Sequence, residues 1–266
     1  MPKLDPGLER VLGALVAGLR ELEVTFCVVG ALVQELLLET PPDIKTNDVD
    51  VVILVADLDA FKAVKDGLAS RGFSQTRVPH RLVYEGGGLA DVLPYSRELA
   101  PGGNLELYPG TVINMAGFDH AVEEAMHVTL DSGLVVPVVP LPLYALLKLI
   151  AFTDRKAQKD VEAVDHLLRN YAETDDRRWG LEYRGKLIDF DYGPAYLLGQ
   201  DGRKFNDDNV AKVIGPLLTR LSDGAGEADD AEKEWKPRRE DLFLWYQRGL
   251  GIGGAAKPSR FRDPFL

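Results

Sequence analysis

The sequence has a single cysteine, no signal peptide pattern and no apolar run long enough to cross a membrane. One cysteine, Cys27, excludes an internal disulfide framework and favours a reducing compartment. Residues 1–6 lack the basic and apolar regions that a signal peptide needs. We therefore expect a cytoplasmic protein that does not insert into a membrane. Because Cys27 lies in the apolar run 24–29, we expect a small core residue rather than a nucleophile.

Positive charge is also scarce, because 31 Lys and Arg residues face 42 Asp and Glu residues, for a net charge of −11. This balance argues against tight, nonspecific binding to nucleic acid, which needs a basic surface. It leaves room for transient action on RNA through a local basic patch. Two small basic clusters beside aromatic residues, at 177–179 and 236–239, are either solvated surface or RNA contacts.

Histidine is rare and scattered, and no cysteine pairs accompany it, so the sequence does not predict a zinc site. The four histidines are His80, His120, His127 and His166.

The 266 residues, 45% hydrophobic and 27% charged, have the composition of an ordinary globular protein. Hydrophobic periodicity and turn residues predict alternating helices and strands in the first half of the chain, then helices. The expected helices cover residues 7–22, 31–39, 57–70, 143–153, 158–171, 195–198, 210–221 and 241–250. The expected strands cover residues 24–29, 48–55, 73–77, 81–84, 89–93, 128–130 and 134–139.

This order predicts an α/β fold of the α+β kind, with a mixed sheet flanked by helices and a helical C-terminal domain after it. We expect the α/β domain to cover residues 1–140 and the helical domain to cover residues 141–266. The second domain would carry an acidic, mobile loop near residues 223–234 and a loose tail from Gly251 onward.

The most informative run is Thr46-Asn47-Asp48-Val49-Asp50, inside a β-branched, apolar stretch. Side chains two apart in a strand point to the same face, so Asp48 and Asp50 should aim together. Two such charges repel unless a cation lies between them, and Mg²⁺ prefers oxygen ligands. The run predicts a strand that holds a divalent metal, Mg²⁺ or Mn²⁺, beside a nucleotide phosphate. A half-exposed strand with a polar outer face is the alternative.

Two flanking features strengthen the metal interpretation. The strand at 24–29 runs into Gly30-Ala31 and then a helix, where backbone amides and a helix N-terminus favour phosphate. Asp91 interrupts the apolar strand at 89–93. Three carboxylates on adjacent strands could hold two metals for in-line displacement at phosphorus.

Gly30-Ala31, the Asp48-Val49-Asp50 strand and the later Asp91 resemble the polymerase-β-like nucleotidyltransferase superfamily. A second stretch, residues 146–168, together with residues 191–199, is similar to the AbiEii-type, toxin-like nucleotidyltransferases. The resemblance covers roughly residues 24–200. One departure is Ala31, where that family often has a second glycine or a serine.

The resemblance implies a nucleotidyltransferase fold and transfer of a nucleoside monophosphate from an NTP to an RNA (tRNA-like) or protein hydroxyl. It also implies a possible antitoxin partner. The catalytic residues would then be Asp48, Asp50, Asp91 and Lys148, and the first three would hold the metal. Gly30, Ala31, Thr46, Lys148 and Asp160 would bind the nucleotide.

Three of these residues also have plain structural interpretations. Lys148, in an otherwise apolar run, either extends its ammonium to water or binds triphosphate. Asp160 either complements a helix N-terminus or neighbours Lys148. Thr46 either ends a turn or contacts phosphate.

Two other function classes stay open at this stage. A catalytically degenerate fold could bind nucleotide or a protein partner, and the Ala31 departure and the acidic surface favour it. A purely structural interaction module is favoured only by the apolar helical half and the tail. The presence of all three carboxylates argues against the degenerate, binding-only protein, because such a protein has no need for a costly acidic cluster.

Overall fold

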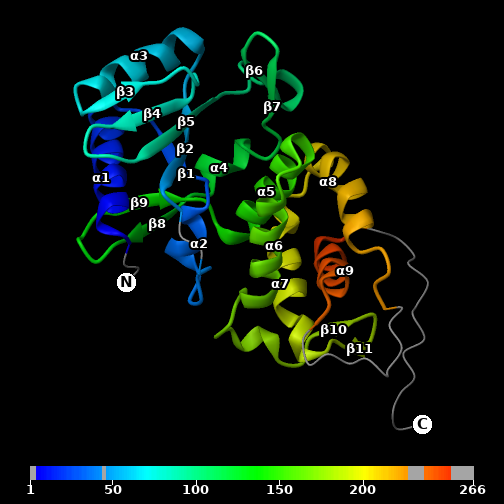
Figure 1. Cartoon of the computed structure of the whole chain (residues 1–266). Helices are drawn as coiled ribbons and strands as arrows, with labels where there is room; N and C mark the ends of the chain where they lie inside the picture. Colours follow the sequence, from blue (N-terminus) through cyan, green and yellow to red (C-terminus); the bar gives the residue numbers. More distant parts are fainter. Residues whose placement is uncertain (1–3, 44–45, 227–236, 253–266) are drawn as a thin grey trace, which may run out of the picture.

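The computed structural model describes residues 4–43, 46–226 and 237–252, and it is built around one mixed sheet (Figure 1). The sheet has seven strands in the order β3-β4-β5-β2-β1-β9-β8. β2 and β5 are parallel, as are β1 and β9, and the other neighbours are antiparallel. Its strands are β1 (Phe26–Val28), β2 (Asp48–Leu54), β3 (Phe73–Gln75), β4 (Arg81–Tyr84), β5 (Leu89–Tyr95), β8 (Met126–Thr129) and β9 (Val135–Val138). The expected fold class, a mixed sheet flanked by helices, is confirmed.

One face of the sheet is sealed by two amphipathic helices, α1 (Pro6–Glu21) and α3 (Leu58–Ala69), which pack together (Figure 1). The Asp5 carboxylate caps α1 by accepting the amide hydrogens of Gly7 and Leu8. Apolar side chains at helical spacing on α1 are buried, as are Val49 and Val51 of β2. The alternation in β2 therefore leaves its acidic residues on the opposite face.

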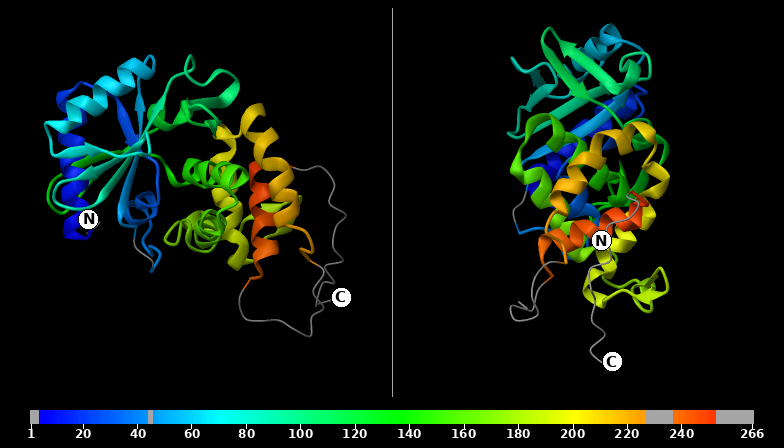
Figure 2. Two further views of the ribbon diagram at one scale, coloured as in Figure 1. Left: turned by 45° about the horizontal axis from the view of Figure 1, so that its top comes forward. Right: turned by 90° about the vertical axis from the view of Figure 1, so that its right-hand side faces the viewer.

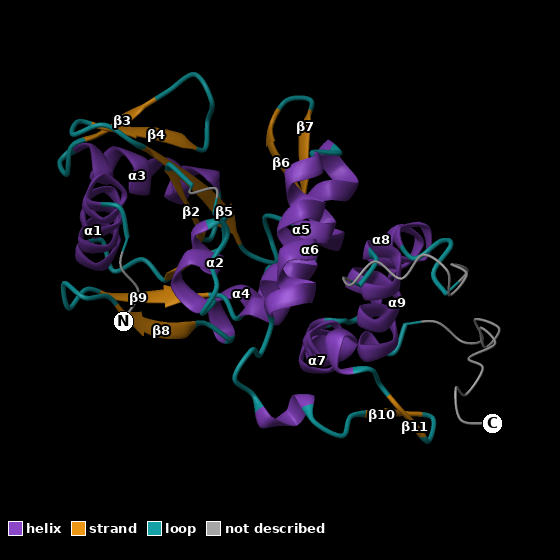
Figure 3. Cartoon of the chain, turned by 60° about the horizontal axis from the view of Figure 1, so that its bottom comes forward, coloured by secondary structure: helices purple, strands orange, loops and turns teal. Residues whose placement is uncertain are grey.

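The opposite side carries α2 (Leu32–Leu37), α4 (Asp119–Glu123) and the long helix α5 (Leu141–Arg155) (Figures 1 and 2). Three of the remaining helices pack on α5 and the fourth, α9 (Arg239–Leu250), packs on those three, and Figure 3 shows all four gathered on one side of the sheet. The other three are α6 (Gln158–Asn170), α7 (Gly193–Gly202) and α8 (Asp208–Leu221). Four 3₁₀ turns are η1 (Pro101–Gly103), η2 (Asp176–Arg178), η3 (Phe190–Tyr192) and η4 (Arg203–Phe205).

Two small hairpins lie outside the main sheet: β6 (Asn104–Tyr108) with β7 (Thr111–Asn114), and β10 (Glu182–Tyr183) with β11 (Lys186–Leu187). The sequence interpretation missed both hairpins, and it missed α4. In β6 the alternation was present, because Leu105 and Leu107 are buried between exposed neighbours. The α4 segment has only five residues, too few for a helical period to show.

Most other expected elements are found, with ends shifted by a few residues. Cys27 is fully buried, as expected of a core residue, and burial raises the pKa of its thiol to about 12. Residues 227–234 of the expected acidic loop, residue 236 of the second basic cluster and residues 253–266 of the tail lie outside the described residues. Within the described ranges, no helix has both the length and the apolar character needed to cross a bilayer.

Helices α7 and α9 cross with their backbones in direct contact, and two glycines make this possible. A Cβ atom on Gly199 would lie 2.3 Å from the carbonyl oxygen of Tyr246, and one on Gly249 would lie 2.3 Å from that of Tyr196. Neither clash can be relieved by turning a side chain, because both partners are backbone atoms.

We predict that Gly199→Ala lowers the free energy of unfolding by about 3 kcal/mol, because the two helices must separate. Gly13→Ala is the matched control, since a Cβ there, inside helix α1, would meet only the side chain of Leu134, at an ordinary contact distance of 3.9 Å. That variant should be neutral or more stable by about 0.5–1 kcal/mol, through lower backbone entropy in the unfolded chain. Urea unfolding of both variants measures the difference. Equal stability of the two would contradict the proposed backbone contact.

Candidate metal and nucleotide site

The three predicted carboxylates meet on one face of the sheet because of strand register. Asp50 of β2 is paired with Asp91 of the parallel strand β5, and Asp48 lies two residues before Asp50. Oxygen atoms of Asp48, Asp50 and Asp91 all lie within 4.8 Å of one another. Asp48 and Asp50 are half-buried, and Asp91 is 8% exposed. The structure thus brings together the acidic residues that the sequence interpretation placed on adjacent strands.

Gly30, which follows β1, lies directly against the side chain of Asp50. A Cβ atom at this position would lie 1.7 Å from Oδ2 of Asp50, so no larger residue fits against that carboxylate. The neighbouring amide of Val29 donates to the carbonyl oxygen of Asp50 at 3.0 Å. Ala31 follows as the N-cap residue of the six-residue helix α2. The glycine was expected to let backbone approach phosphate; the structure supplies a further reason, which is room for the Asp50 side chain.

Asp50 is the electrostatic centre of the cluster. Burial, followed by repulsion from Asp48 and Asp91, raises the pKa of the Asp50 carboxyl to about 6, although Lys148 and Arg155 pull it back down. A carboxylate in this position carries a cost when it is ionised at neutral pH. A bound cation would remove that cost, because it would replace the repulsion by attraction.

Thr46 orients the first carboxylate. Its hydroxyl donates to Oδ1 of Asp48 at 2.6 Å, and its backbone amide donates to Oε1 of Glu35 at 3.0 Å. Glu35 belongs to α2 and is 9% exposed, so this contact ties the start of β2 to that helix. Thr46 therefore supports Asp48, whichever of the two expected roles it also performs.

Lys148 lies on α5, and its charge is close enough to lower the pKa of Asp50. Its side chain is 14% exposed, and its Nζ lies 3.4 Å from Oδ1 of Asp160, which is fully buried. Arg155 binds the same carboxylate with two hydrogen bonds, Nε to Oδ2 at 2.7 Å and Nη2 to Oδ1 at 2.5 Å. Burial alone would raise the pKa of Asp160, but the contacts with Arg155 and Lys148 lower it below its ordinary value. Asp160 thus holds Lys148 in place, as its expected position beside Lys148 suggested.

The sequence interpretation did not assign a role to Arg81. Arg81 of β4 is paired with Asp91, and its guanidinium binds both oxygens of that carboxylate. A signal for it was present, because three successive glycines at residues 86–88 mark a hairpin turn, and counting back from that turn puts Arg81 opposite Asp91. Arg155 lies within the stretch 146–168, and nothing in the sequence shows that it pairs with Asp160 close to the acidic strand.

These residues fit a divalent metal. The donors are carboxylate oxygens, which Mg²⁺ and Mn²⁺ prefer, and they converge from two adjacent strands. Gly30 keeps the site free of a side chain on one flank, and Lys148 offers a cation on another. Burial and the repulsion from Asp48 and Asp91 outweigh the effect of the nearby cations Lys148 and Arg155, so the pKa of Asp50 stays raised.

A second group of possible ligands consists of Asp119, His120 and Asp207. Oδ1 of Asp207 accepts the amide hydrogens of Asn209 and Val210 and so caps α8. His120 Nε2 lies 3.7 Å from the other oxygen of Asp207. One member of the group, Asp207, is therefore already used as the N-cap of α8.

The expected basic cluster at 177–179 is partly used within the protein. Arg177 pairs with Asp175 and with Asp201. Trp179 is 72% exposed and contacts Phe190 in a tilted arrangement, with 4.6 Å between ring centres and 35° between ring planes. These contacts favour a structural surface over an RNA contact.

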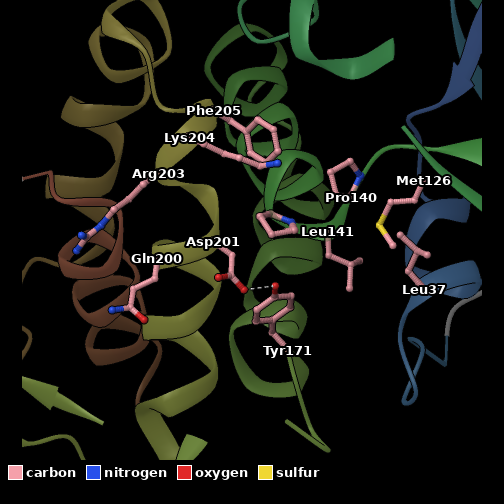
Figure 4. A pocket seen from close by; sticks show the side chains of 11 residues that line it. Leu37, Met126, Pro140, Leu141, Tyr171, Gln200, Asp201, Arg203, Lys204 and Phe205 are labelled. Atoms are coloured by element: carbon pink, nitrogen blue, oxygen red, sulfur yellow. Dashed lines mark hydrogen bonds between the residues drawn. The ribbon is translucent and has the colours of Figure 1, made fainter. Parts of the chain in front are cut away.

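A cavity of about 660 Å³ lies elsewhere, between α2, β8 and the start of α5 on one side and α7 on the other (Figure 4). Its apolar side includes Leu37, Met126 and Leu141. On its polar side Tyr171 donates to Asp201 at 2.7 Å. None of the predicted site residues lines it, so the carboxylate cluster and this cavity are separate features.

No protein-family model and no curated protein sequence matches the chain. Several solved structures are similar to it, including the following three. An antigenic nucleotidyltransferase-like protein from Paracoccidioides brasiliensis is 14% identical, with a TM-score of 0.46, over 84% of this chain and 92% of that one. The antibiotic-resistance factor ANT(2'')-Ia is 12% identical, with a TM-score of 0.34, over 58% of this chain and 78% of that one. CdnC in its HORMA-deltaN complex from E. coli MS115-1 is 15% identical, with a TM-score of 0.27, over 86% and 67%. Because these values are low, the function has to be argued from the site.

We predict that Asp50→Asn is more stable than the wild type at pH 7 in EDTA. The pKa of Asp50 is about 6 in the folded protein and about 3.9 in an unfolded chain. The folded state therefore binds the proton more tightly, and stability falls as pH rises from about 4 to about 6. The variant escapes this loss, which amounts to about 2–3 kcal/mol at neutral pH.

Thermal unfolding from pH 4 to pH 8, with and without Mg²⁺, measures the effect. Mg²⁺ should stabilise the wild type and leave Asp50→Asn unchanged. The matched control is Asp59→Asn, which removes an exposed carboxylate in the first turn of α3. If Asp50→Asn were the less stable protein at pH 7 in EDTA, Asp50 would be a structural residue.

Proposed function

We propose that the protein is a metal-dependent nucleotidyltransferase that moves a nucleoside monophosphate from an NTP to a hydroxyl acceptor and releases pyrophosphate. The observation that carries the proposal is the convergence of Asp48, Asp50 and Asp91 within 4.8 Å, facing the cationic side chain of Lys148. An acidic cluster with a nearby cation is suited to binding a metal–triphosphate complex.

The proposed roles follow from the contacts of each residue. Asp48 and Asp50 would hold Mg²⁺ or Mn²⁺, with Thr46 orienting Asp48 through its 2.6 Å hydrogen bond. The metal, when bound, would act as a Lewis acid toward the phosphates. Asp91 would complete the metal site or accept the proton of the attacking hydroxyl.

The nucleotide would lie between the sheet and α5. Gly30 and Ala31 would face the phosphates through their backbone. The Lys148 contact with Asp160 is long, at 3.4 Å, so its ammonium is available to a phosphate oxygen. Asp160 keeps Arg155 as a bidentate partner when Lys148 turns away, so Asp160 would serve the nucleotide indirectly.

For the acceptor, we propose an RNA end, such as that of a tRNA, or a protein hydroxyl. This rests on the similarity of residues 146–168 and 191–199 to AbiEii-type nucleotidyltransferases. The same similarity supports the role of a toxin held in check by an antitoxin. The net charge of −11 favours an acceptor that binds transiently over one held by a broad basic surface.

A second candidate is a catalytically degenerate protein that binds nucleotide without turnover. The specific observation in its favour is Arg81, which already binds both oxygens of Asp91. Ala31 also offers no hydroxyl to the phosphates. The two candidates differ in turnover and share nucleotide binding.

We predict that the wild type transfers label from at least one α-labelled NTP, in Mg²⁺ or Mn²⁺, to total cell RNA or to protein. Asp48→Ala/Asp50→Ala should reduce transfer by at least a thousandfold, because the metal can no longer be held. Asp59→Ala is the control for loss of a carboxylate elsewhere. Thermal shift with Mg²⁺ and NTP reports binding in the same samples. Binding without transfer would favour the degenerate protein, and equal transfer by all three proteins would rule out the assignment.

We also predict that Lys148→Met raises the KM for NTP by about tenfold to a hundredfold, through loss of one charged contact worth about 1.5–3 kcal/mol. The fold should persist, because Arg155 still satisfies Asp160. Lys159→Met, at an exposed position beside Asp160 in the sequence, is the matched control. A large drop in the melting temperature of Lys148→Met alone would make Lys148 architectural.

A further inference from the structure

Arg81 is placed where a cation of the proposed reaction would also bind. Its Nε donates to Oδ1 of Asp91 at 2.7 Å and its Nη2 donates to Oδ2 at 2.6 Å. Strand register fixes the pair, since Arg81 and Asp91 are direct partners across β4 and β5. The pair therefore forms part of the same cross-strand row as Asp50.

The guanidinium acts on the whole cluster and not on Asp91 alone. The hydrogen bonds from Arg81 to Asp91 raise the pKa of the guanidinium, and the charges of Asp48 and Asp50 raise it further. Arg81 is thus an internal cation that neutralises part of the acidic site. A metal ion that approaches Asp91 meets this positive charge and finds both oxygens engaged.

Arg81 is also free to leave. Its side chain is 37% exposed, whereas that of Asp91 is 12% exposed, so the arginine is much more open to solvent than the carboxylate it binds. Phosphate oxygens offer arginine the same paired acceptors that a carboxylate offers, with more negative charge. A triphosphate in the site would therefore compete with Asp91 for Arg81.

We propose that Arg81 is a positioning residue that makes the availability of Asp91 depend on the nucleotide. Without nucleotide, Arg81 holds Asp91, and the protein binds one divalent cation at Asp48 and Asp50. With a triphosphate present, Arg81 turns to the phosphates and releases Asp91 to a second cation or to the acceptor hydroxyl. This inference rests on the proposed function.

An ion pair with only a structural role would behave differently. It would join β4 to β5, and its loss would lower stability without changing how many cations the protein binds. The count and affinity of bound cations therefore separate the two roles.

The test is titration of the nucleotide-free protein with Mn²⁺ alone, followed by calorimetry and by the electron paramagnetic resonance signal of free Mn²⁺. We expect one Mn²⁺ per chain for the wild type and two for Arg81→Gln, or a second site at least tenfold tighter than in the wild type. Adding a non-hydrolysable NTP analogue should bring the wild type to two. Arg71→Gln, which removes an arginine paired with Glu21 outside the site, is the matched control and should bind like the wild type.

Arg81→Lys provides a second variant if Arg81→Gln does not fold. A lysine ammonium cannot bind both Asp91 oxygens side by side, so its second Mn²⁺ should bind more tightly than in the wild type. Identical Mn²⁺ binding by the wild type and the Arg81 variants would overturn the inference, as would two Mn²⁺ ions in the nucleotide-free wild type. Asp50→Asn tells this failure apart from failure of the proposed function. If Asp50→Asn loses the Mn²⁺ binding that the wild type shows, the metal site stands even when the inference about Arg81 is wrong. No Mn²⁺ binding by the wild type would overturn both.

Discussion

The structure of this site depends on the mutual repulsion of three carboxylates that strand pairing forces together. The register of β2 against β5 sets Asp50 opposite Asp91, and the period of the strand adds Asp48 on the same face. A shift of one residue would turn these side chains into the apolar layer under α1, where Val49 and Val51 are fully buried. The hydrophobic core on one face of the sheet therefore holds the charged cluster on the other.

Two cationic side chains offset this repulsion, and a glycine leaves room for one of the carboxylates. The guanidinium of Arg81, on the neighbouring strand, donates hydrogen bonds to both oxygens of Asp91. The ammonium of Lys148, on α5, acts on Asp50 from a greater distance and lowers the pKa of that carboxyl. Gly30 adds no charge and instead yields space to Asp50. The balance is incomplete, as the raised pKa of Asp50 shows. An incomplete balance is what a site needs if it is to bind a cation rather than only to be stable.

Much of this arrangement could be predicted from the sequence, because it rests on local periodicity. The alternation around Asp48 and Asp50 identified their strand and its polar face, and the apolar run around Asp91 identified a second strand. The metal interpretation placed the two strands side by side, but periodicity did not give the full strand order or the register that sets Asp50 opposite Asp91. The contact of Asp160 with Arg155 depends on how α5 packs on α6, which periodicity does not report. Within residues 101–127, strands β6 and β7 were missed although the alternation in β6 was present, and α4 was missed because five residues are too few for a helical period to show.

The helical half contributes to the site through one buried charge. Asp160 is fully buried, more deeply than any of the three cluster carboxylates, and its partners Arg155 and Lys148 lie on the preceding helix. A buried carboxylate is tolerated only when its oxygens are paired, and Arg155 pairs both. Lys148 is therefore not required to stabilise Asp160, which explains its long contact of 3.4 Å. The ammonium is held near the acidic cluster by charge and by packing, and it remains free to turn toward a more negative partner. The same logic applies to Arg81 on the other side of the site. Each cation lies beside a carboxylate that orients it without saturating it, so an incoming triphosphate would find two cations already aimed at the place where its charge would lie.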